Sequence, residues 1–361
     1  MAETPDESHP ERTEPTDARV ELTQLARGLR ETVLDVLWRQ WRVIGARSAS
    51  WHSGAERPMP TLIDPEALVL ISLVLLDDEP RLADVMRDWV ALNADVLSVQ
   101  RLKNLSDGYF SDPRVLTSRL AWLAATAGEK GKPPRWHALA VSPAATAGSG
   151  ADDSAPVARP VTRGGRRAVT PNNADRAPVR PALARFPDPP ALTLCFRLAF
   201  GVGVKADLLA LLFTKSALWP TIRQIADATG YTVAATRRGA DDLVAAGLLS
   251  VRPDQPARYG FVHAPWAPLL GLDADRPMRW GYWHERFQVT ADLLQWAAAA
   301  QLHPLSPYAA GAQGRALLER HRGALTRDDP APWALDVVAP EGVAVLRAEF
   351  ARLGESMQQD A

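Results

Sequence analysis

Hydrophobic residues recur every three or four positions along much of this chain, which is the spacing of amphipathic helices. The longest run covers residues 20–44, and its apolar positions are Leu22, Leu25, Leu29, Val33, Leu37, Trp41 and Ile44. Asp64-Pro65-Glu66 places an N-cap residue before a proline at the first helical position. It should therefore open another helix, which is apolar on nearly all sides and so central. Further helices are expected over residues 81–90, 97–105, 113–127, 278–300, 312–325 and 340–353.

Two stretches lack this periodicity. Residues 1–18 hold six acidic residues and one arginine, with too little apolar surface to offset the entropy of ordering, so they should form a disordered acidic tail. Residues 142–190 are dominated by Pro, Ala, Gly, Ser and Arg, which is typical of a flexible linker. The remaining segments predict an N-terminal helical lobe (19–141), a central domain (191–270) and a C-terminal helical region (271–355), a candidate dimerisation or effector domain.

The most informative segment is TIRQIADATGYTVAATRRGADDLVAAGLL, residues 221–249. Its two helical halves flank Gly230-Tyr231-Thr232, in which glycine permits a left-handed turn and Thr232 suits the N-cap of the next helix. The inward face of that helix carries Thr236, Ala240 and Leu243. The opposite face carries Ala234, Arg237, Arg238 and Asp241. A helix with one small apolar face and one basic face suits the major groove of DNA.

Gly247 should end this helix. After it, strand-like arms at 249–252 and 258–262 flank a Pro-Asp-Gln-Pro turn and predict a hairpin with Arg252 and Arg258 near its tip. Residues 204–262 as a whole resemble the winged helix-turn-helix of bacterial transcription regulators of the MarR and GntR types. The matching features are the IRQIADATGYT support helix and turn, the VAATRRGADDLVAAGLL recognition helix, and the hairpin as the wing.

The chain departs from the family pattern at Gly239 and Ala240, where such helices usually carry larger or more helix-favouring residues. A glycine inside a helix implies either a softer helix or close packing on a neighbouring element. The fold class expected is therefore mainly α with small β-wings: a winged helix-turn-helix domain, an N-terminal helical lobe and a C-terminal helical region.

The resemblance implies binding of double-stranded DNA, as a homodimer, because a two-fold protein matches palindromic sites. Arg237 and Arg238 should contact bases or phosphates, and Arg223 should contact phosphates beside the hairpin arginines. The residues expected at the DNA are Arg223, Thr232, Ala234, Arg237, Arg238, Arg252 and Arg258. In the linker, Arg163, Arg166 and Arg167 surround two glycines, which resembles a minor-groove arm, and the alternative, that these charges simply belong to a solvated linker, is the simpler one.

Composition narrows the class of protein. The net charge is −1, so affinity for DNA must come from local clusters such as residues 156–185, which hold seven arginines and one aspartate. The lone Cys195 cannot form an internal disulfide, and no signal peptide or apolar run of membrane-spanning length occurs, which together predict a cytoplasmic protein without membrane contact.

Signals for catalysis are weak. Gly201-Val202-Gly203 lacks the third glycine of a dinucleotide loop, and the seven histidines show no metal-ligand spacing. We therefore expect no enzyme, no metal and no cofactor.

Several alternatives stay open. The N-terminal lobe is either an ordinary helical lobe or a second helix-turn-helix, with 98–105 as its recognition helix carrying Arg101 and Lys103. The aromatic stripe Trp280, Trp283, Phe287, Leu294 and Ala297 suits a core, an oligomer interface or a ligand-pocket wall. The last helix carries Val343, Leu346, Phe350 and Leu353, which would suit a dimer seam.

Two rival functions accompany the DNA-binding regulator. In the first, the chain is an interaction protein, such as an antitoxin-like or defence-system accessory subunit, that uses the winged helix to dock a protein partner. In the second, it is a small-molecule sensor whose effector lies against the aromatic C-terminal stretch.

Overall fold

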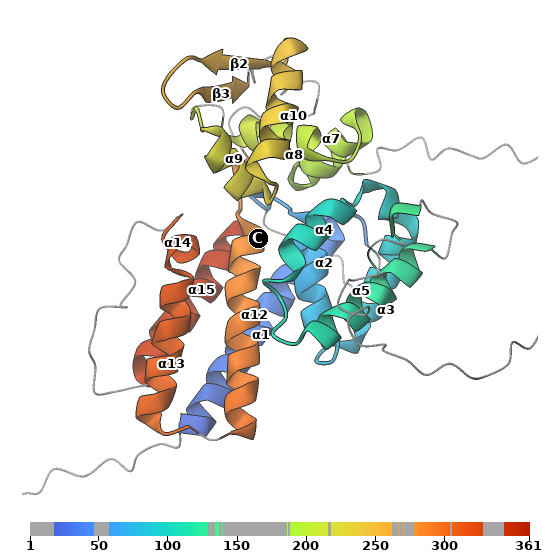
Figure 1. The fold of residues 1–361 in the computed structure, drawn as a ribbon. Coiled ribbons are helices and arrows are strands. Elements are labelled where there is room, and N and C mark those ends of the chain that lie inside the picture. Colours follow the sequence, from blue (N-terminus) through green and yellow to red (C-terminus); the bar gives the residue numbers. More distant parts are fainter. Residues whose placement is uncertain are drawn as a thin grey trace, which may run out of the picture.

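The computed structural model describes residues 18–46, 58–128, 134–136, 139, 186, 188–215, 218–261, 266, 270, 278–303, 305–327 and 343–361. The predicted acidic tail up to residue 17 and the predicted linker up to residue 185, with Arg163, Arg166 and Arg167, lie outside these residues, whereas Ala18, counted in the tail, is buried at the start of the first helix. The described part is mainly helical, with only short strands (Figure 1). None of its helices is long and apolar enough to cross a membrane.

Helices from both ends of the chain form one helical body, in the lower part of Figure 1. Its long helices are α1 (Ala18–Val43), α12 (Trp283–Leu302), α13 (Pro307–Arg320) and α15 (Val343–Asp360), with the short α14 (Arg322–Leu325). The others are α2 (Pro65–Val74), α3 (Pro80–Asn93), α4 (Val99–Ser106) and α5 (Pro113–Gly128). Because α1 packs on α12 and α15, the predicted N-terminal lobe and C-terminal region share a single hydrophobic core.

Helix α2 lies at the centre of the body, as its sequence predicts. Residues 65–73 are all buried, and the Asp64 side chain caps the helix by accepting from the backbone N–H of Ala67 at 3.0 Å. The aromatic stripe on α12 is also core, since Trp283, Phe287 and Ala297 are each at most 1% exposed.

The apolar face of α15 is occupied within the chain. The residues that suit a dimer seam are all buried: Val343, Leu346, Phe350 and Leu353. They belong to the cores that α15 shares with α1 and α13, so in this structure they are not available to a second copy.

A smaller unit with its own core lies above the body (Figure 1). It contains α8 (Val204–Thr214), α9 (Ile222–Thr229), α10 (Val233–Ala245) and the strands β2 (Leu249–Arg252) and β3 (Arg258–Phe261). We call residues 204–261 the module. Helix α7 (Leu192–Phe200) packs on α8 and leads from the body into the module. Strands β2 and β3 form an antiparallel hairpin in which Leu249 faces Phe261 and Arg252 faces Arg258.

The turn at Gly230 and the cap at Thr232 that the sequence predicts are confirmed, and α9 has in addition a cap of its own. Thr221 and Gln224 form a reciprocal capping box at the start of α9. Gly230 has φ +71° and ends α9, and Thr232 caps α10 by accepting from the backbone N–H of Ala235 at 3.2 Å.

Gly239 reflects close packing rather than a soft helix. A Cβ at this position would lie 2.8 Å from a methyl group of Val204, so the missing side chain lets α10 approach α8 closely.

A short parallel pairing connects the body to the segment that follows the module. Strand β1 (Thr61–Leu62) pairs with β4 (Arg279–Trp280). The helix expected from residue 278 therefore begins only at Trp283, because residues 279–280 are extended against β1. Phe186, near the C-terminal end of the predicted linker, is buried, and its ring lies 6.4 Å from that of Trp89 in the body.

Candidate nucleic-acid interface

The residues of α9 and α10 that the sequence places at the DNA are exposed. Arg237 and Arg238 on α10 are exposed, and neither has a hydrogen-bond or ion-pair partner among the residues that the structure describes. Thr232 and Ala234, at the start of the same helix, are exposed too, as is Arg223 on α9. All five side chains are thus accessible, and their contact with DNA stays a prediction.

The two hairpin arginines are exposed but held by Trp219. The guanidinium carbon of Arg252 lies 3.9 Å from the centroid of the Trp219 ring, which is a cation–π contact. Arg258 donates from Nη1 to the backbone oxygen of Trp219 at 3.1 Å, and its Nε lies 3.5 Å from Asp254 Oδ2. Because exposed ion pairs contribute little, Arg258 can exchange Asp254 for another anion at small cost.

Helix α4 packs against the turn of the module instead of presenting a second basic helix. Asn104 donates from Nδ2 to the backbone oxygen of Gly230 at 3.1 Å, and a Cβ at position 230 would lie 2.7 Å from Leu105. Arg101 is 2% exposed, so of the two alternatives for this lobe the structure does not fit the one in which Arg101 lies outward on a second recognition helix. Lys103 on the same helix is exposed.

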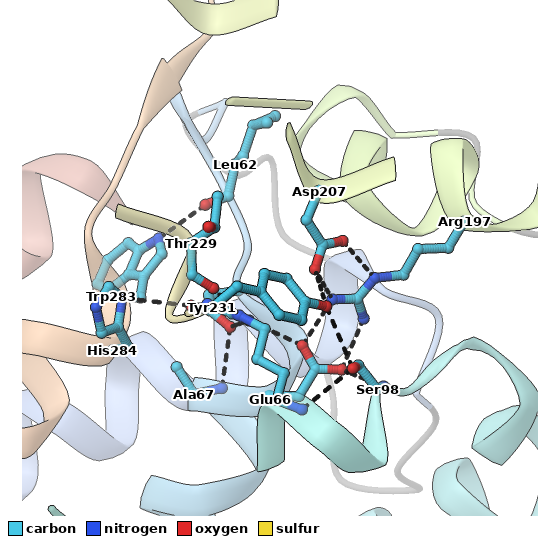
Figure 2. A network of polar contacts seen from close by, with 12 residues as sticks. Leu62, Glu66, Ala67, Ser98, Arg197, Asp207, Thr229, Tyr231, Trp283 and His284 are labelled. Atoms are coloured by element: carbon cyan, nitrogen blue, oxygen red, sulfur yellow. Dashed lines mark hydrogen bonds and ion pairs between the residues drawn. The ribbon is translucent and has the colours of Figure 1, made fainter. Parts of the chain in front are cut away.

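Beneath this turn lies a buried polar network that joins the module to the body (Figure 2). Its charged members come from four helices and the N-cap of α2: Asp64, Glu66, Arg101, Arg197 and Asp207. Each of these side chains is at most 5% exposed.

Arg101 connects α4 to the start of α2 and to the module. Its two Nη atoms form a bidentate pair with the Asp64 carboxylate, and Nη1 also donates to Glu66 Oε2 at 2.8 Å. Its Nε donates to the backbone oxygen of Thr229, the last residue of α9, at 2.5 Å. One guanidinium therefore fixes the end of α9 relative to α2.

Arg197 is the second bridge. It donates two hydrogen bonds to Asp207 on α8, both at 2.7 Å, and two to Glu66 at 2.7 and 2.8 Å. A fifth bond reaches the backbone oxygen of Val96 at 3.0 Å. Tyr231, in the turn before α10, completes the connection, since its hydroxyl lies 2.9 Å from Asp207 Oδ2 and 3.2 Å from Ser98 Oγ.

Ion pairing favours the charged forms of Asp64 and Arg197 although both side chains are buried. Burial alone would raise the pKa of Asp64, but the charge and hydrogen bonds of Arg101 outweigh burial and lower this pKa to about 2. Burial disfavours the charge of Arg197, yet the adjacent Asp207 and Glu66 raise its pKa. Burial and the charge of Asp207 raise the pKa of Tyr231, so its hydroxyl keeps the proton that it donates.

His284 stands at the edge of this network. Burial lowers its pKa to about 4, against the opposing charge of Asp64, whose Oδ2 lies 3.8 Å from Nδ1. The imidazole is therefore neutral at pH 7. No group of three or more His, Cys, Asp or Glu side chains in the described residues has a metal-site arrangement. The hydrogen bonds of Arg101, Arg197 and Tyr231 hold the module and the body together.

Sequence reasoning missed this network, although a signal is present. Glu66 and Arg197 are each the single charged residue of an apolar helical run, PEALVLISLV and LTLCFRLAF, and Asp207 shares the run VKADLLALLF with Lys205 alone. Charged residues are almost never fully buried unless they are paired, so isolated charges in buried helices indicate partners. The pattern does not indicate which charges pair.

Comparisons of the chain with protein-family models, with curated proteins and with solved structures give no match.

Proposed function

We propose that this protein is a DNA-binding regulator and that residues 204–262 are a winged helix-turn-helix that reads duplex DNA. The observation that carries the proposal is the pair of exposed arginines, Arg237 and Arg238, on the helix after the Gly230 turn, which have no partner among the described residues. Arginine can bind guanine bidentately from the major groove, and an exposed guanidinium loses no existing ion pair when it does so.

The surroundings of α10 support this proposal. Helix α10 packs closely on α8 where Gly239 faces Val204. The buried network fixes the turn that precedes α10, through Thr229 and Tyr231. A recognition helix held in this way presents its side chains without first being ordered. Arg252 and Arg258 on the hairpin would then reach the phosphate backbone beside the groove.

The test is the double variant Arg237→Gln/Arg238→Gln. Fluorescence anisotropy with a labelled duplex should show an affinity loss of about tenfold or more. When the logarithm of the affinity is plotted against the logarithm of the salt concentration, the slope should be shallower by about 1–2. The matched control is Arg114→Gln/Arg347→Gln, which removes two exposed charges from α5 and α15 of the body. Equal affinities and slopes for the two double variants would refute the proposed DNA face.

A second function, docking of a protein partner, has its own support in exposed apolar side chains on the same elements. Val233 on α10 and Val251 on β2 are each 41% exposed. If the full chain shows no salt-dependent binding to duplex DNA at low ionic strength, the regulator proposal fails and docking takes its place.

A further inference from the structure

A polar cavity lies where the module meets the body, beside the end of α15. Figure 1 shows this end of α15 next to the module, at the mark C. Its volume is about 570 Å³, within the range of sites that bind small molecules. The lining comes from the end of α8, from β1 and β4, and from α12 and α15. Of the aromatic residues in the stretch 279–296, Trp280 lines it. The cavity thus includes one residue of the predicted aromatic stripe, and its other lining residues are polar or charged.

The charged side chains around the cavity are predominantly cationic. The cations are Lys215, Arg279, Arg286 and Arg352, and the carboxylates are Glu355 and Asp360. Asp360 already accepts from Arg279 at 2.6 Å and from Arg286 at 2.5 Å. The cavity therefore has an excess of positive charge in a concave, partly desolvated place, where the field of such charges is concentrated.

Three of these cations, Arg279, Arg286 and Lys215, are held in position before any ligand arrives. Arg286 is 7% exposed, and its ion-pair partner is Asp360. Asp360 is held in turn, because its backbone oxygen accepts a hydrogen bond from the Thr61 hydroxyl at 2.5 Å. Lys215 has its ammonium 5.1 Å from the centroid of the Tyr282 ring. Preorganised donors lower the entropic cost of binding an anion.

We propose that this cavity binds a small anionic molecule through its carboxylate or phosphate group. Lys215 from the module and Arg352 from α15 lie on opposite sides of the junction and would both contact the anion. A bound anion would therefore change how the module sits on the body. This regulatory consequence rests on the proposed function, whereas the binding itself does not.

Calorimetry on the full chain tests the binding with three probes: ribose 5-phosphate, succinate and uncharged ribose. At least one anion should bind saturably and ribose should not, and the anion that binds identifies the group recognised. Lys215→Gln and Arg352→Gln should each weaken binding about tenfold or more, since each removes a charge-assisted contact.

Arg347→Gln is the matched control, because Arg347 is exposed on the same helix α15 and lines a different groove. It should bind like the wild type. Absence of binding for both anions, or equal binding by Arg352→Gln and Arg347→Gln, overturns the proposal. Lys215→Gln serves as the second variant if circular dichroism shows that Arg352→Gln is misfolded.

The regulatory part has a separate readout. A saturating concentration of the anion that binds should change the duplex affinity of the wild type at least threefold, and that of Lys215→Gln much less. Anion binding without any change in duplex affinity rejects the coupling and leaves the binding site standing. Absence of duplex binding under all conditions counts against the proposed function alone.

Discussion

Arg197 joins the module to the body, and Arg197→Met should lower the free energy of unfolding by about 3–5 kcal/mol, the range for removing one partner of a buried ion pair. The substitution removes five hydrogen bonds. Glu66 would still accept hydrogen bonds from Arg101, at 2.8 Å, and from the backbone N–H of Ser98, at 2.7 Å. Within the described residues, the side chain of Asp207 would keep its hydrogen bond from the Tyr231 hydroxyl but lose its ion-pair partner, leaving only the more distant charge of Arg101. Most of the loss should therefore come from this uncompensated carboxylate.

The double variant Arg197→Met/Asp207→Asn isolates the contribution of that carboxylate. Asp207→Asn, added to Arg197→Met, removes the uncompensated charge and should recover about 1 kcal/mol or more of the loss. In the wild type, Asp207→Asn alone should be destabilising, because Arg197 then loses a charged partner. The effect of the same substitution thus changes sign with the residue at position 197.

The assay is guanidinium-chloride unfolding at pH 7, followed by circular dichroism, with slopes compared between variants. Arg237→Met is the control, since an exposed arginine without a partner among the described residues should change stability by no more than about 0.5 kcal/mol. If Arg197→Met is too unstable to purify, Tyr231→Phe removes one hydrogen bond to a carboxylate and should cost about 1.5–3 kcal/mol. The bridging role of Arg197 is refuted if Arg197→Met matches the control, or if Asp207→Asn is equally destabilising in both backgrounds.

Three further predictions follow from single residues. Because the pKa of His284 is about 4 in the folded chain and about 6.5 when unfolded, the unfolded state binds more protons between these values. Stability should therefore fall by about 3 kcal/mol as pH drops from 7 to 4, and His284→Gln, but not the exposed His303→Gln, should flatten this dependence in thermal melts. Gly239→Ala should be destabilising by about 1–3 kcal/mol from overpacking, despite a helix-propensity gain of up to about 1 kcal/mol; a raised melting temperature would show that α8 yields easily. Thr221→Ala should cost about 1 kcal/mol by removing the cap of α9, measured by urea unfolding, and no loss would mean that the cap is dispensable.

Local features of this protein could be predicted from its sequence. The apolar spacing locates α1 and α10, the Asp64-Pro65 cap locates α2, and the short-range chemistry of Gly230 and Thr232 gives the turn between α9 and α10. These features depend on residues within about one helical turn of each other, so the necessary information is adjacent in the chain. The exposure of Arg237 and Arg238 follows from the same periodicity.

Only the tertiary structure decided what these elements touch. Arg101 has the spacing of an outward basic residue, yet it is buried because Asp64 and Glu66, more than thirty residues away, supply its counter-charges. Arg197 meets Glu66 across 131 positions, and α1 shares a core with α15 from the far end of the chain. Periodicity reports which face of a helix is apolar but not which distant element covers it. The buried network and the cationic cavity therefore exist only once the module has packed on the body.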